Sequence, residues 1–215
     1  MNEDVKFFSG IALVVIVIIV GVILYSRAGN STAPGASVQD AALLVRPDSQ
    51  SITATSSKVT VVEFGDYQCP ACGAAQPIVS KVLSDNQGKI NFVFRNFPLP
   101  QHQYAIISAE AAEIAGDQGK FWQMHDRLYA EQDKWVNSSD PKPLFIQYAK
   151  DLGLNVDQFT KSLNANKYAD KIQRDLVDGT TVGVNATPTF FVNGVSMLLN
   201  TSADLQNAIT KALQK

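Results

Sequence analysis

The sequence of 215 residues has few cysteines and histidines and no cluster of basic residues. It contains two cysteines and two histidines, and the histidines lie far along the chain from the cysteines, so the ligand set of a structural zinc site is missing. No block of lysine and arginine occurs, and the formal net charge of −2 gives nucleic-acid binding no electrostatic support. We therefore expect neither a metal site nor a nucleic-acid partner. Hydrophobic residues make up 46% of the chain, enough for one medium-sized domain and additional segments.

Charged residues are absent from residues 7–25, a run of about 19 mostly apolar residues. A helix of this length crosses the hydrocarbon core of a bilayer, so we predict a single transmembrane anchor. The alternative is a cleaved signal peptide, because Ser26 and Ala28 are small residues at the two positions that a signal peptidase reads. We favour the anchor because the apolar part of a signal peptide usually has about 7 to 15 residues. No cysteine follows the run, which excludes a lipoprotein.

The two cysteines form one motif, Cys69-Pro70-Ala71-Cys72, between a strand-like run and a helical stretch. Cysteines three residues apart on the first turn of a helix share one face and lie close enough to form a disulfide. The unpaired N–H groups and the positive dipole end of that turn stabilise a thiolate, and Pro70 fits there because its missing N–H costs nothing. The motif indicates dithiol–disulfide exchange. A purely structural disulfide would close too small a loop to stabilise the fold much.

The basic residues beside the anchor do not decide its orientation, because Lys6 precedes it and Arg27 follows it. A catalytic disulfide persists most readily in an oxidising compartment. We therefore place residues 1–6 in the cytoplasm and the domain outside the cytoplasm, at the cell surface or in the periplasm. Residues 26–40 are small, polar and turn-prone, and we predict that they form a flexible linker.

Hydrophobic periodicity predicts an α/β domain over residues 41–215, with the order β-α-β, helical block, β-β-α. Strands are expected at 43–45 (a short edge strand), 59–64, 90–95, 189–192 and 195–198, the last two joined by the hairpin signal Asn193-Gly194. Helices are expected at 70–86, within 104–129, at 143–149, 156–163 and 168–177, and at 202–213.

Four segments in this order resemble the DsbA-like branch of the thioredoxin superfamily, particularly its membrane-tethered members. They read Val-Glu-Phe-Gly-Asp-Tyr-Gln-Cys-Pro-Ala-Cys at 62–72, Phe-Arg-Asn-Phe-Pro-Leu at 94–99, Phe-Trp-Gln-Met-His-Asp at 121–126 and Ala-Thr-Pro-Thr-Phe-Phe-Val-Asn-Gly at 186–194. The resemblance implies a thioredoxin fold with a helical domain, about residues 103–180, inserted between its second and third core strands. It also implies thiol:disulfide oxidoreductase activity on exported proteins, with the Cys69–Cys72 disulfide in place of a cofactor.

We expect the two sulfurs to differ in role. Cys69 lies at the exposed start of the helix, where its pKa is lowered, and is the predicted nucleophile. Cys72, one turn further in, is the predicted resolving thiol. Many DsbA-like proteins carry histidine or another polar residue at the position of Ala71. Alanine supplies no positive charge to the thiolate, so the sequence does not predict the reduction potential of the Cys69–Cys72 disulfide.

Glu63 has two interpretations. Simple alternation along the strand allows it to face solvent. The resemblance instead implies a buried acid beneath the cysteine pair, whose pKa is raised and which moves the proton of Cys72.

Thr187 and Pro188 precede the strand at 189–192, where a proline requires either a strand edge or a cis turn. The resemblance implies a cis-proline loop against the cysteine pair, in which the backbone of Thr187 binds an extended substrate segment. His102 and His125 have no partner visible in the sequence, and we assign neither to the site.

The sequence therefore predicts a membrane-anchored oxidoreductase that donates its disulfide to exported cysteine-containing proteins. The resemblance implies recycling by a DsbB-like or VKOR-like membrane quinone reductase. A reductase or isomerase of the same fold and a noncatalytic tethered chaperone or scaffold are the alternatives. The sequence does not predict the direction of disulfide exchange, the natural substrates, the recycling partner, the oligomeric state or whether the N-terminal segment is cleaved.

The orientation is testable with a fusion at the C-terminus. A reporter that is active only after export is expected to be active when joined after Lys215, because the anchor places the domain outside the cytoplasm. A reporter that works only in the cytoplasm, fused at the same junction, is the control. Activity of that second reporter would show that the domain lies in the cytoplasm and would contradict the predicted orientation.

Overall fold

The computed structural model describes residues 39–197 and 199–214. The predicted anchor at 7–25 and most of the linker lie outside these residues, so they stay predictions. Within the described ranges, no helix has the length and apolar character needed to cross a membrane.

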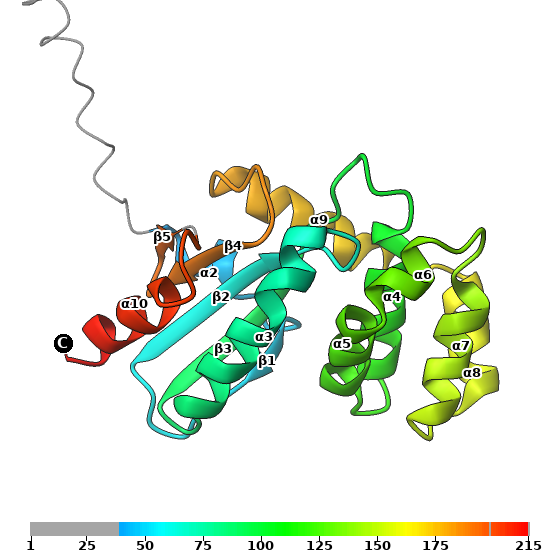
Figure 1. Cartoon of the computed structure of the whole chain (residues 1–215), viewed down its shortest axis with the longest axis horizontal. Coiled ribbons are helices and arrows are strands. Elements are labelled where there is room, and N and C mark those ends of the chain that lie inside the picture. Colours follow the sequence, from blue (N-terminus) through cyan, green and yellow to red (C-terminus); the bar gives the residue numbers. More distant parts are fainter. Residues whose placement is uncertain (1–38, 198, 215) are drawn as a thin grey trace, which may run out of the picture. The chain divides into compact units, whose positions relative to one another are not determined.

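A five-stranded sheet in the order β1-β3-β2-β4-β5 forms the centre of the domain (Figure 1). The strands are β1 Gln50–Ile52, β2 Val59–Gly65, β3 Ile90–Asn96, β4 Thr189–Val192 and β5 Val195–Met197. The central pair β2 and β3 is parallel, whereas β1 on β3, β4 on β2 and β5 on β4 are antiparallel. A parallel pair needs a crossover connection, and the helix that follows β2 supplies it.

The helices are α2 Ala41–Leu44, α3 Pro70–Asp85, α4 Ala105–Gly116, α5 Phe121–Ala130, α6 Gln132–Val136, α7 Lys142–Asp151, α8 Val156–Asn164, α9 Ala169–Thr181 and α10 Asp204–Leu213. Helices α4 to α8 gather beside the sheet, and α9 returns toward it (Figure 1). The insertion falls between β3 and β4, as the resemblance implies.

Strand β2 is buried on both faces, because its successive side chains point to opposite faces of the sheet and pack into two different hydrophobic cores. Val59 and Val61 belong to the larger core, which includes residues of α3, the helical block and α10. Val62 and Phe64 belong to a second core with Leu44 of α2 and Phe191 of β4. Every residue of β2 except Thr60 is buried.

The predicted strand at 43–45 is wrong. Ala41–Leu44 forms a helical turn instead, because the Asp40 carboxylate accepts a hydrogen bond from the backbone N–H of Ala42, 2.9 Å away, and caps it. One edge of the sheet is formed by β1, which the sequence analysis did not predict as a strand. The short helix α6 was also missed. The other predicted helices and strands that lie in the described residues are confirmed, with boundaries shifted by a few residues.

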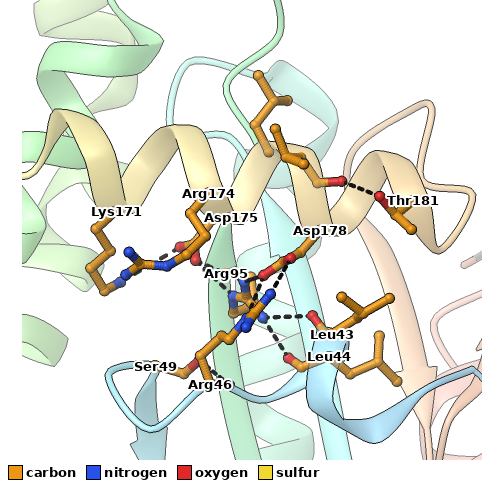
Figure 2. Close-up of polar contacts among 12 residues, drawn as sticks. Leu43, Leu44, Arg46, Ser49, Arg95, Lys171, Arg174, Asp175, Asp178 and Thr181 are labelled. Atoms are coloured by element: carbon orange, nitrogen blue, oxygen red, sulfur yellow. Dashed lines mark hydrogen bonds and ion pairs between the residues drawn. The ribbon is translucent and has the colours of Figure 1, made fainter.

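A buried ionic network holds the return helix α9 and the start of the domain against β3 (Figure 2). Arg95 of β3 is fully buried and pairs with Asp175 at 2.9 Å and with Asp178 at 2.6 Å, both on α9. The same guanidinium donates to the carbonyl oxygens of Leu43 and Leu44, at 2.8 and 2.9 Å. A buried charge is tolerated only when it is paired and hydrogen-bonded, so this arginine fixes the position of all three segments.

Candidate active site

The cysteine motif lies where β2 ends and α3 begins. Asp66 shapes the connecting loop, since its carboxylate accepts from the N–H of Gln68 at 2.8 Å and its carbonyl accepts from the N–H of Cys69 at 3.1 Å. Cys69 is the N-cap residue of α3, with extended backbone angles, and Pro70 occupies the first turn. Cys69 is 7% exposed, so the expectation of an exposed nucleophile is wrong, and Cys72 is 1% exposed, as expected for the inner thiol. Both are free thiols.

The two sulfurs have opposite electrostatic environments. The hydrogen bond from the Cys72 thiol, followed by those from the backbone N–H groups of Cys72 and Ala71, outweighs burial and lowers the pKa of Cys69 to about 5. Burial is the largest effect on Cys72 and raises its pKa well above the ordinary value, and the neighbouring Cys69 and Glu63 add to this. At neutral pH the pair therefore consists of a thiolate at Cys69 and a thiol at Cys72.

Glu63 points to the α3 side of the sheet and is 1% exposed, so the solvent-facing interpretation is wrong. Burial alone raises the pKa of its carboxyl to about 8, which keeps it mostly protonated at neutral pH. Its strand neighbours in register are Phe94 and Phe190, which offer no charge. Its Oε2 atom has no hydrogen-bond partner among the described residues.

The peptide bond between Thr187 and Pro188 is cis, as the resemblance implies. The loop faces the nucleophile, since the Cys69 Sγ lies 3.4 Å from the carbonyl oxygen of Thr187. A groove of about 470 Å³ runs beside it. Its walls include Ala71 and Ile78 of α3, Thr187 and Pro188 of the loop, and Leu199. Ala71 thus contributes a small exposed side chain to the groove and a backbone N–H to the thiolate.

Gln132 of the helical block contacts the motif directly, and the sequence analysis missed it. Its side-chain amide donates to the carbonyl oxygens of Tyr67 at 2.6 Å and Cys69 at 3.0 Å. Gly73 leaves the space that this amide fills, because a Cβ there would lie 2.5 Å from the Gln132 Oε1 atom. No sequence signal identifies this pairing, since Gln132 is a polar residue some 60 positions away from the motif.

The two histidines have different surroundings. His102 lies with its Nδ1 atom 2.7 Å from Asp66, whose same carboxylate oxygen accepts from the N–H of Leu99 at 2.9 Å. It therefore supports the motif loop, a role that the sequence analysis did not assign. His125 is a packing residue: it is buried, its Nδ1 lies 3.0 Å from the Tyr67 hydroxyl, and burial lowers its pKa to about 3.

No group of three or more histidine, cysteine, aspartate or glutamate side chains suited to a metal occurs within 39–197 and 199–214. What the site does contain is an ionised sulfur at the surface end of a helix, a protonated sulfur behind it and a protonated carboxyl beneath both. This arrangement is suited to exchanging a disulfide and moving one proton.

Comparison with known proteins supports this chemistry. The sequence profile of the family described as Thioredoxin matches residues 47–211. A thioredoxin-like oxidoreductase from Silicibacter pomeroyi is 25% identical, with a TM-score of 0.69, over 82% of this chain and 99% of that one. BdbD from Bacillus subtilis is also 25% identical with a TM-score of 0.69, over 78% of this chain and 94% of that one. The alpha-DsbA1 of Wolbachia pipientis, 23% identical with a TM-score of 0.70 over 80% and 94%, shares the fold.

The chain is also similar to part of several proteins that are named as Na(+)/H(+) antiporters. The Na(+)/H(+) antiporter NhaA 1 of Salinispora arenicola is 45% identical over 137 residues, which is 63% of this chain and 20% of the antiporter. NhaA 3 of Salinispora tropica is 43% identical over the same length. The chain thus matches only about a fifth of the length of these relatives.

Gln132→Met is expected to raise the pKa of Cys69 by about one unit, because releasing the carbonyls of Tyr67 and Cys69 loosens the turn that holds the sulfur near its hydrogen-bond donors. The absorbance of the thiolate near 240 nm, followed against pH, measures it. Gln147→Met is the matched control, because the Gln147 amide binds Asp151 at the surface of α7. Identical titration curves for the two variants would show that Gln132 has no influence on the thiolate.

Proposed function

The chain belongs to the thioredoxin superfamily, among its DsbA-like thiol:disulfide oxidoreductases, and we propose that it introduces disulfides into exported proteins through the Cys69–Cys72 disulfide. The observation that carries this proposal is the opposite protonation of the two sulfurs at the start of α3.

The reaction proceeds in two exchanges. A substrate thiolate attacks Cys69 Sγ in the Cys69–Cys72 disulfide, that bond breaks, and Cys72 leaves and takes the proton of the Glu63 carboxyl. A second substrate thiolate then attacks the substrate sulfur of the mixed disulfide, and Cys69 leaves as a thiolate. The substrate loses two electrons and gains a disulfide, and the protein keeps the two electrons as its reduced pair.

Stabilisation of the Cys69 thiolate supports the oxidising direction. It exists in the reduced protein and is absent from the disulfide, so it favours the reduced state and makes the disulfide a stronger oxidant. Ala71 adds no positive charge. The Cys72 thiol and the backbone N–H groups at the start of α3 supply the stabilisation instead.

Substrate recognition needs little side-chain specificity. The backbone of Thr187 sits opposite Cys69 and is suited to pairing with an extended segment, as one short added strand. The groove between α3, the cis-proline loop and residues 199–202 has mainly small or apolar walls, which fit the apolar side chains of an unfolded chain. We propose that this groove holds the substrate beside the cysteine to be oxidised.

Turnover needs an electron acceptor. A DsbB-like or VKOR-like membrane quinone reductase would accept the two electrons and reform the Cys69–Cys72 disulfide. The predicted anchor at 7–25 and linker at 26–40 would keep the domain near such a partner, outside the cytoplasm.

The division of labour between the sulfurs is tested by trapping. Cys72→Ala is expected to accumulate mixed disulfides with substrate proteins, because no resolving thiol releases them, whereas Cys69→Ala accumulates none. Reducible high-mass bands on a nonreducing gel measure this. Equal trapping by both variants would contradict the assignment, and absence of trapping together with absence of insulin-reducing and dithiol-oxidising activity in the wild type would favour a noncatalytic scaffold.

A further inference from the structure

Tyr129 of α5 carries a buried polar group that the exchange reaction, as described so far, does not use. Its side chain is almost fully enclosed, and its hydroxyl has no hydrogen-bond partner among the described residues. Leaving a buried hydroxyl unpaired costs about 1 to 3 kcal/mol. Phenylalanine would fill the same space without that cost, so the hydroxyl calls for an explanation.

The hydroxyl reaches the strand that carries Glu63. A Cβ built on Gly65 would lie 3.1 Å from the Tyr129 oxygen, so the glycine leaves room for this approach. Residues 63 and 65 point to the same face of β2, about 7 Å apart along the strand. The Oε2 atom of Glu63 is also without a partner. Two buried, unsatisfied polar groups therefore lie on one face of the sheet, beside Cys72.

Tyr129 forms part of the wall of a groove that opens to solvent. This groove lies between α3 and α5, has a volume of about 270 Å³, and is also lined by Gly73, Gln76, Pro77, Ser80, Asp126 and Ala130. At its surface the Gln76 amide donates to the Asp126 carboxylate at 3.2 Å. Tyr129 thus lies between the solvent in this groove and the buried acid.

The other polar groups near Tyr129 are already engaged. The Tyr67 hydroxyl pairs with His125, which stays neutral because burial lowers its pKa to about 3. The Asp66 carboxylate is held by the N–H groups of Gln68 and Leu99 and by His102. Burial, followed by the charges of Cys72, Glu63, Tyr67 and Asp66, raises the pKa of Tyr129 well above its usual range, so a tyrosinate does not persist.

We propose that Tyr129 acts through Glu63: its hydroxyl relays protons between solvent in the α3–α5 groove and the Glu63 carboxyl. The inference rests on the proposed function, because it supplies the proton that Cys72 exchanges. After Cys72 takes the Glu63 proton, the carboxylate takes the hydroxyl proton of Tyr129, directly or through one water molecule. The tyrosine oxygen regains a proton from a water molecule that reaches it from the groove, and it ends neutral. The reverse sequence releases the Cys72 proton when Cys72 attacks a mixed disulfide.

Tyr129→Phe tests the relay, and the chain offers a matched control. Tyr148 on α7 is likewise buried, and its hydroxyl likewise has no partner in the described part of the chain. Each substitution removes one oxygen and keeps the ring, which for Tyr129 packs against Tyr67 at 5.0 Å and His125 at 5.1 Å. Neither hydroxyl has a hydrogen-bond partner among the described residues, so both variants are expected to fold with melting temperatures close to that of the wild type.

The first readout is the rate of the exchange step that involves Cys72. Tyr129→Phe is expected to slow it about tenfold near neutral pH, within the usual range for acid–base groups, and Tyr148→Phe to leave it unchanged. Because the loss lies in proton supply, the solvent deuterium isotope effect should rise in Tyr129→Phe only. Equal rates and isotope effects in the two variants would overturn the relay.

The second readout does not need activity. At pH 6 the Glu63 carboxyl is protonated, and its C=O infrared band, identified by its loss in Glu63→Gln, shifts when the proton is replaced by deuterium. Exchange into heavy water is expected to be about tenfold slower in Tyr129→Phe than in Tyr148→Phe. Equal exchange would overturn the relay even if the wild type oxidises substrates, and slower exchange would uphold it even if the wild type proves to be inactive.

Discussion

The hydrogen bond from the Cys72 thiol to the Cys69 sulfur is the interaction on which the rest of the site depends. It is the largest of the effects that lower the pKa of Cys69, and it requires that Cys72 keep its proton. Burial enforces that requirement, and the hydrogen bond that the Cys72 thiol donates to Cys69 adds to it. The nucleophile and the resolving thiol are therefore coupled, because each holds its protonation state through the other, whereas burial alone keeps the proton on Glu63.

The surrounding fold keeps this small group of atoms in place from several sides. The two hydrophobic cores cover β2 on both faces, so Glu63 has no route to bulk solvent along its strand. The helical block supplies Gln132, which binds the carbonyl of the nucleophile itself. Arg95 and its aspartates hold α9 against β3 (Figure 2), and the chain leaves α9 toward the cis-proline loop. The insertion is therefore part of the active-site support and not only an attachment to a thioredoxin core.

Features that depend on neighbouring residues could be predicted from the sequence, whereas contacts between distant residues could not. The cysteine motif at a helix start, the strands of the core and the amphipathic helices depend on short-range patterns, and they were predicted correctly. Alternation could not place Glu63, because a strand buried on both faces has no solvent side. Residues 41–44 show the limit for short apolar runs, in which an Asp40 cap decides between helix and strand. Gln132 and His102 were missed because their partners Cys69 and Asp66 are close only in the folded chain.

The central claim is that the protein stabilises its reduced form through the Cys69 thiolate, and the most direct measurement compares the unfolding free energies of the reduced and oxidised forms across pH. The pKa of Cys69 falls from an ordinary value of 9.0 to about 5 on folding, so this stabilisation is complete above pH 9 and is lost as the pH falls through 5. We expect the reduced form to be the more stable at pH 8, with an advantage that shrinks by up to about 1.4 kcal/mol per pH unit on acidification. An oxidised form that is more stable at every pH would contradict the account and favour a reductase.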